Sequence, residues 1–140
     1  MEGNRIHLQT NLSAPIAQVF YQLKNSSRFL EETCSARRVL LLDLGFLGDS
    51  IHLLPALWTL RQAYHRAELH VMVSEHVTRI MDVVPWVDKV WGYPRYPRGP
   101  KWYQDLGRIR KLRAARFDVV INLNGSDRSS ILTGTSGACW

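Results

Sequence analysis

The chain has 140 residues, of which 46% are hydrophobic and 21% are charged, and its formal net charge is +6. This length suits one compact domain with a real core and is too short for two full domains. The composition excludes an intrinsically disordered chain, and the positive charge favours an anionic partner without choosing among phosphate, nucleic acid and a membrane surface.

The first 36 residues form an extension that differs in pattern from the rest. Ile16, Val19, Phe20 and Leu23 follow helical spacing and predict one amphipathic helix within residues 1–36. The polar face of this helix carries few cations, which argues against membrane-surface binding by the helix itself. The sequence shows neither a secretory signal nor the roughly 20 apolar residues of a membrane span, so we expect a cytoplasmic protein.

From Arg37 onward, strand and helix patterns alternate. The apolar run at residues 37–44 shows no alternation, which predicts a strand buried on both faces of a parallel sheet. Three further strands are predicted at residues 67–75, 87–94 and 117–125. Helices are expected between them, at residues 50–64, 76–83 and 101–115. Pro55 either kinks the first of these helices or marks its start. The order predicts an α/β fold, a Rossmann-like parallel sheet with flanking helices, over residues 37–140.

In such a sheet, ligands bind in the crevice beyond the carboxyl ends of the strands. Two loops are expected there: "LGFLGDS" after the first strand and "LNGSDRSS" after the fourth. In the first loop, Gly45 and Gly48 permit a tight turn, and backbone amides at a helix start can hold an anion. No Walker motif and no complete dinucleotide-binding motif is present. The lack of space for a side chain in a tight turn and the binding of a ligand therefore explain these glycines equally well.

Asp49 in the same loop has two candidate roles. Asp is a favoured N-cap, and Asp49 directly precedes the helix expected from Ser50, so spacing alone favours a capping role. A carboxylate at this edge of the sheet is also a candidate general base for an acceptor hydroxyl. His52 is a weaker acid/base candidate, because a histidine in an apolar helix is more often packed.

The second loop places Asn124, Ser126, Asp127 and Arg128 close together. Asp127 and Arg128 either cap a following helix and lie on its exposed surface, or they bind a ligand. The forked guanidinium of Arg128 suits an anionic sugar or a phosphate.

Eight cations and one acid, Asp105, lie between Arg95 and Arg116. This stretch is either a solvated helix face or a surface that attracts a phosphorylated glycolipid. Aromatic residues interleaved with glycine, typical of RNA-binding modules, are missing, so we expect no nucleic-acid partner.

Taken together, the "LGD" after the first strand, the "PAL" that follows it, and "FDVVINLNGSDRSS" are fairly specific. With the segments around them, they resemble the amino-terminal half of the lipopolysaccharide heptosyltransferases, over residues 37–138. The resemblance implies a GT-B glycosyltransferase, in which this domain binds the acceptor and a second domain binds the nucleotide sugar, ADP-heptose. It also implies an inverting transfer that needs no metal and no cofactor beyond the sugar donor.

The catalytic aspartate of that family falls on Asp49, which the resemblance identifies as the base that deprotonates the acceptor hydroxyl. The implied substrate-binding residues come from both loops: Gly45, Gly48, Ser50, Asn124, Ser126, Asp127 and Arg128. The implied partner is a glycolipid of the lipopolysaccharide inner core, met at the inner face of the inner membrane.

Two departures from the family stand out. Relatives often carry a cation six residues before the aspartate, where this chain has Asp43, and the donor-binding half is missing from these 140 residues. The alternative functions are a non-catalytic module that binds an anion or a partner, and a Rossmann-like protein that binds a nucleotide itself.

Overall fold

The computed structural model describes residues 27–94 and 102–140. The helix predicted around residues 16–23 lies outside these ranges, as do three of the predicted cations, Arg95, Arg98 and Lys101. The chain divides into two compact units, Met1–Glu32 and Thr33–Trp140. In the described part of the first unit, which is helical, Arg28 pairs with Glu32 at 2.7 Å between Nε and Oε1.

The second unit alternates strands and helices, as predicted. Its strands are β1 (Arg38–Asp43), β2 (Glu68–Ser74), β3 (Lys89–Tyr93) and β4 (Val119–Asn122). Its helices are α2 (Leu47–Ala63), the short pair η1 (Glu75–Val77) and α3 (Thr78–Met81), α4 (Trp102–Ala115) and α5 (Asp127–Thr135).

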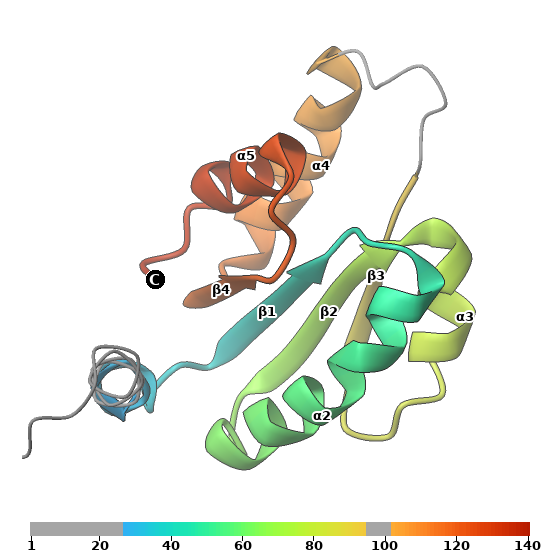
Figure 1. Ribbon diagram of the computed structural model, residues 1–140. Coiled ribbons are helices and arrows are strands. Elements are labelled where there is room, and N and C mark those ends of the chain that lie inside the picture. The colour runs from blue at the N-terminus through green and yellow to red at the C-terminus, as the bar shows by residue number, and fades with distance from the viewer. Residues whose placement is uncertain (1–26, 95–101) are drawn as a thin grey trace, which may run out of the picture. The chain divides into compact units, whose positions relative to one another are not determined.

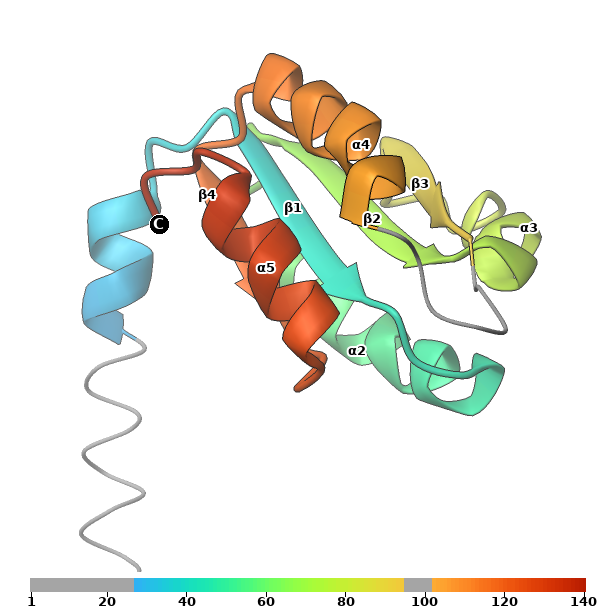
Figure 2. The same cartoon turned by 90° about the horizontal axis from the view of Figure 1, so that it is seen from above.

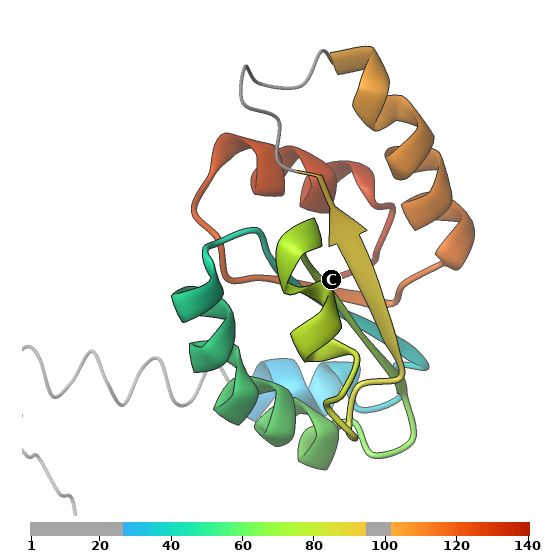
Figure 3. The same cartoon turned by 90° about the vertical axis from the view of Figure 1, so that its right-hand side faces the viewer.

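The four strands form one parallel sheet in the order β3-β2-β1-β4. Helices α2 and α3 cover one face, and α4 and α5 cover the other (Figures 1 and 2). Figure 3 shows α3 and α4 on opposite sides of β3. The predicted fold class, a Rossmann-like parallel sheet with flanking helices, is confirmed.

Successive side chains of β1 point to opposite faces of the sheet and fill the core on both sides. Leu40 and Leu42 point to the face of α4 and α5, where they pack with other buried side chains: Met72, Tyr93, Leu112, Phe117, Val120 and Leu132. Val39 and Leu41, also fully buried, point to the opposite face. Both faces of the strand are therefore apolar, which is why its sequence does not alternate between apolar and polar residues.

Helix α2 begins three residues earlier than predicted, at Leu47 instead of Ser50. Pro55 neither starts nor ends this helix, because it lies inside it. Within the described ranges, no helix combines the length and the apolar character needed to cross a membrane.

The backbone of Trp140 pairs with the outer edge of β4. Its N–H donates to the carbonyl of Asp118 at 3.2 Å, and its carbonyl accepts from Val120 N at 2.8 Å. This is the bonding pattern of a parallel bridge, so Trp140 runs in the same direction as β4.

His70 makes the stability of this domain depend on pH. It is buried in β2, where its Nδ1 accepts from Trp91 Nε1 at 3.2 Å and its ring meets the edge of Phe117. Burial lowers the pKa of His70, so the unfolded chain takes up this proton before the folded one does. This contribution is complete above about pH 7 and is lost as the pH falls below about 6.5, the ordinary histidine value.

We therefore expect urea unfolding of the wild type to show a falling free energy between pH 7 and 5. His70→Gln, whose amide oxygen can still accept from Trp91, should show a flatter profile over the same window. His65→Gln is the control, because His65 is exposed. Parallel profiles for wild type and His70→Gln would contradict this assignment.

Candidate functional site

A cleft of about 850 Å³ opens at the carboxyl ends of the strands. Its lining comes from the loops after β1 and β4 and from the ends of β2, β3, α4 and α5: Leu44, Gly45, Phe46, Asp49, Ser74, Tyr93, Pro94, Asp105, Leu106, Ile109, Asn124, Ser126, Asp127, Arg128, Ile131 and Leu132. The chain leaves β1 toward one face of the sheet and leaves β4 toward the other, which opens a crevice between these neighbouring strands.

The loop after β1 is organised by two carboxylates. Asp43, only 5% exposed, accepts from Gly45 N at 3.0 Å through Oδ1. Asp49 Oδ2 accepts from Phe46 N at 2.9 Å. A Cβ on Gly45 would lie 2.6 Å from Asp49 Oδ2, 2.8 Å from Asp49 Cβ and 3.0 Å from Asp43 Oδ1, so a larger residue would force these carboxylates to shift. Gly45 is thus required by this close approach, which answers one of the questions that the sequence left open.

The predicted N-cap role of Asp49 is corrected in detail. Phe46 is the N-cap residue of α2, and Asp49 occupies the third helical position, from which its carboxylate reaches back to the cap amide. This reach-back bond is the acidic half of a capping box. Asp49 does stabilise the start of the helix, while its exposed side chain still lines the cleft.

Asparagine and serine side chains hold the loop after β4 in place. Asn122 Oδ1 accepts from Asn124 N at 3.0 Å, and Asn124 Oδ1 accepts from Ser126 N at 3.0 Å. Ser126 is the N-cap of α5 and accepts from Ser129 N. The side-chain amide of Asn124 also donates to Asp43 Oδ1 at 3.3 Å, so Asp43 ties both loops together.

Tyr93, at the end of β3, lies close to two arginines. Its hydroxyl donates to Asp105 Oδ1 at 2.9 Å, and Arg108 donates to the same oxygen at 3.2 Å. The guanidinium carbons of Arg108 and Arg128 lie 5.2 and 5.8 Å from the Tyr93 ring centroid. Burial, then the hydrogen bond to Asp105, raise the pKa of Tyr93 above its ordinary value, so the phenol acts as a donor.

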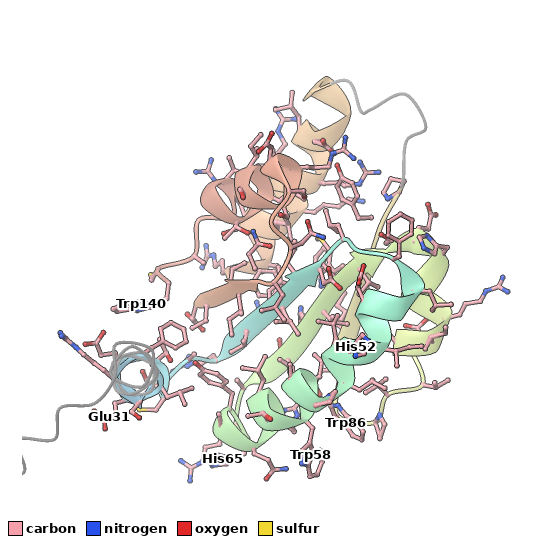
Figure 4. The ribbon with its side chains drawn as sticks, viewed as in Figure 1. Glu31, His52, Trp58, His65, Trp86 and Trp140 are labelled. Carbon is pink, nitrogen blue, oxygen red and sulfur yellow. The ribbon has the colours of Figure 1, made fainter. Side chains whose placement is uncertain are left out.

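Not every predicted binding residue reaches the cleft. The cleft brings together Gly45, Asp49, Asn124, Ser126, Asp127 and Arg128. Gly48 and Ser50 are absent from its lining, and the buried Ser50 hydroxyl donates to the Phe46 carbonyl at 3.2 Å. His52 is exposed on α2, on the face of the sheet opposite α4 and α5 (Figure 4).

Sequence reasoning missed the contributions of β2 and β3. Ser74 Oγ donates to the carbonyls of Leu44 and Gly45 at 3.0 and 3.1 Å, which fixes the first loop. Ser74 and Tyr93 are the last residues of their strands. Their position at the carboxyl ends of predicted strands could have identified them as site residues from the sequence.

The predicted basic stretch is divided by α4. Arg108 lies near the cleft end, at Asp105, whereas Arg116 lies beyond the other end of the helix. The charged residues that line the cleft are Asp49, Asp105, Asp127 and Arg128, so carboxylates outnumber cations there. The part of the stretch that the structure describes therefore gives the cleft no continuous basic surface.

The spacing around the two loop glycines predicts opposite effects of adding a methyl group. Gly45→Ala should destabilise the domain by about 1–3 kcal/mol, as overpacking does. Gly48→Ala should stabilise it by about 0.5–1 kcal/mol, since Gly48 lies in α2 and no described atom lies within 4 Å of its Cβ position. Urea unfolding measures both, and equal effects would contradict the steric account of Gly45.

No model of a protein family matches this sequence, and no curated protein matches it. Solved structures do. The glycosyl transferase family 9 protein from Veillonella parvula matches 74% of this chain with a TM-score of 0.68 and 26% identity. The heptosyltransferase WaaC of E. coli, solved with ADP, matches 72% with a TM-score of 0.57 and 28% identity.

The E. coli ADP-heptose heptosyltransferase II matches 73% of the chain with a TM-score of 0.57 and 22% identity, a likeness of fold alone. The matched segment spans 30%, 32% and 29% of the three proteins in the order given. The resemblance to the heptosyltransferases is thereby confirmed: this chain has the fold of about a third of such a glycosyltransferase.

Proposed function

We propose that this domain is the acceptor side of a heptosyltransferase-like glycosyltransferase of GT-B architecture. It would take part in transferring a sugar from a nucleotide sugar, ADP-heptose, to the lipopolysaccharide inner core. The observation that carries this proposal is the position of Asp49, whose carboxylate lines the cleft at the end of β1 in a domain that matches known glycosyltransferases.

The geometry of Asp49 suits a general base. Its Oδ2 accepts from Phe46 N, which fixes the carboxylate, and Oδ1 makes no hydrogen bond to the described residues. In the proposed reaction, Asp49 takes the proton of an acceptor hydroxyl. The hydroxyl oxygen bonds to the anomeric carbon as the bond from that carbon to the nucleotide diphosphate breaks, and attack opposite the leaving group inverts the configuration.

The rest of the cleft suits a sugar acceptor. Asp127 offers a carboxylate to sugar hydroxyls, and Asn124 and Ser126, whose side chains also hold the loop, line the cleft beside it. Arg128 makes no hydrogen bond to the described residues, and it supplies a guanidinium for an acidic or phosphorylated sugar. Apolar side chains that line the same cleft and are exposed, Leu106 and Ile131, can pack against the pyranose ring and exclude water from it.

The same contacts disfavour nucleotide binding by this loop. A phosphate at the start of α2 would need free backbone amides, but Gly45 N and Phe46 N already donate to Asp43 and Asp49. The two carboxylates would also repel a phosphate. The donor is therefore assigned to a second domain, as a co-substrate, with neither a metal nor a resident cofactor in the proposal. We place the protein in the cytoplasm, at the inner face of the inner membrane.

Asp49→Asn separates the capping role from the catalytic one. Asparagine keeps an oxygen that can accept from Phe46 N but cannot act as a base. In a protein that carries this domain together with a donor-binding domain, we expect kcat to fall about 10²–10⁴-fold while thermal unfolding hardly changes.

Asp82→Asn is the control, since Asp82 is an exposed aspartate at the end of α3. It should leave kcat unchanged. Near-normal turnover by Asp49→Asn would show that Asp49 is not the base.

A further inference from the structure

A second hollow, of about 790 Å³, lies at the amino-terminal ends of the strands, the edge opposite the cleft. Segments that precede β1, β2 and β4 line it, and each brings an arginine. The lining is Cys34, Ser35, Ala36, Arg37, Arg38, Arg66, Glu68, Arg116 and Asp118. Four guanidinium groups therefore meet two carboxylates in one concave site.

Both carboxylates are already engaged. Asp118 Oδ2 accepts from the backbone amides of Arg37 and Arg38 at 2.7 and 2.9 Å. Glu68 Oε2 accepts from Arg38 Nε at 2.8 Å, and the Arg38 side chain also donates to the carbonyl of Ala115 at 2.8 Å. The carboxylates thus hold Arg38 and the chain before β1, and the four arginines of the hollow still outnumber them.

Three guanidinium groups have no acceptor among the described residues. The side chains of Arg37, Arg66 and Arg116 make no hydrogen bond or ion pair to the residues that the structure describes. Like charges that converge on one hollow repel one another, so an anion bound between them would be stabilised. Arg116 follows α4 with φ of 52°, a left-handed conformation in which glycine is the usual residue.

We propose that this hollow binds a phosphate-bearing anion, either the headgroup of an anionic phospholipid or a soluble phosphate ester. Guanidinium forks match phosphate oxygens two at a time, which suits the three unengaged arginines. The hollow is separate from the cleft and shares no residue with it. This inference does not rest on the proposed glycosyltransferase function.

The test compares two triple variants with the same net charge. Arg37→Gln/Arg66→Gln/Arg116→Gln removes the three unengaged cations of the hollow. Arg79→Gln/Arg110→Gln/Lys111→Gln removes three exposed cations that do not line it. Binding of the whole chain is measured to pyrophosphate, by calorimetry, and to vesicles of phosphatidylcholine with or without phosphatidylglycerol, by sedimentation at fixed ionic strength.

We expect the wild type and the control variant to bind with similar affinity, and the hollow variant to bind at least about tenfold more weakly. Binding only to the phosphatidylglycerol vesicles would identify a lipid headgroup, and binding only to pyrophosphate a soluble ester. The proposal fails if the wild type binds neither probe, or if both triple variants lose binding equally. Arg66→Gln alone, at an exposed turn residue, guards against misfolding of the triple variant and should itself weaken binding.

Discussion

The close approach of two carboxylates to Gly45 is the constraint on which the candidate site depends. Asp43 comes from the end of β1 and Asp49 from the first turn of α2, and both reach the space that a Cβ on Gly45 would occupy. Their bonds to the amides of Gly45 and Phe46 leave the loop little freedom. The sharp turn from strand to helix, the start of α2 and the place of Asp49 in the cleft therefore follow from one local packing arrangement.

The order of the strands converts this local arrangement into a site. Because β1 pairs with β4 and the helices that follow them cover opposite faces, the two loops diverge from neighbouring strand ends. The bond from Asn124 to Asp43 joins them beneath the cleft. Asp43 is a buried carboxylate that acts as a structural link between the two loops.

The sequence predicted the fold well, because the two central strands, β1 and β2, are buried along most of their length and appear as apolar runs that are easily recognised. It placed the start of α2 three residues late, because Gly48 is a residue type typical of loops. An aspartate can also stabilise a helix start either as the N-cap residue or from the third helical position, and the sequence alone does not distinguish these two positions for Asp49. Because α2 begins earlier, Ser50 lies within the helix on the side that faces the protein interior, and it does not line the cleft.

The other missing parts of the site depend on long-range packing. The register of β2 and β3 brings Ser74 and Tyr93 side by side at the cleft, and packing of α4 brings Asp105 to the Tyr93 hydroxyl. The sequence also suggested one continuous basic surface, because a run of cations does not show at which end of a helix each side chain lies. The length of α4 places Arg108 and Arg116 at different ends of the sheet.

The central claim is that the cleft between the loops after β1 and β4 holds a sugar acceptor beside Asp49. Chemical-shift mapping of the isotopically labelled chain tests it most directly, with a core oligosaccharide and ADP-heptose as separate titrants. The account predicts that the oligosaccharide alone shifts the amide signals of residues 44–49 and 124–128. Shifts of these amides by ADP-heptose and not by the oligosaccharide would contradict it.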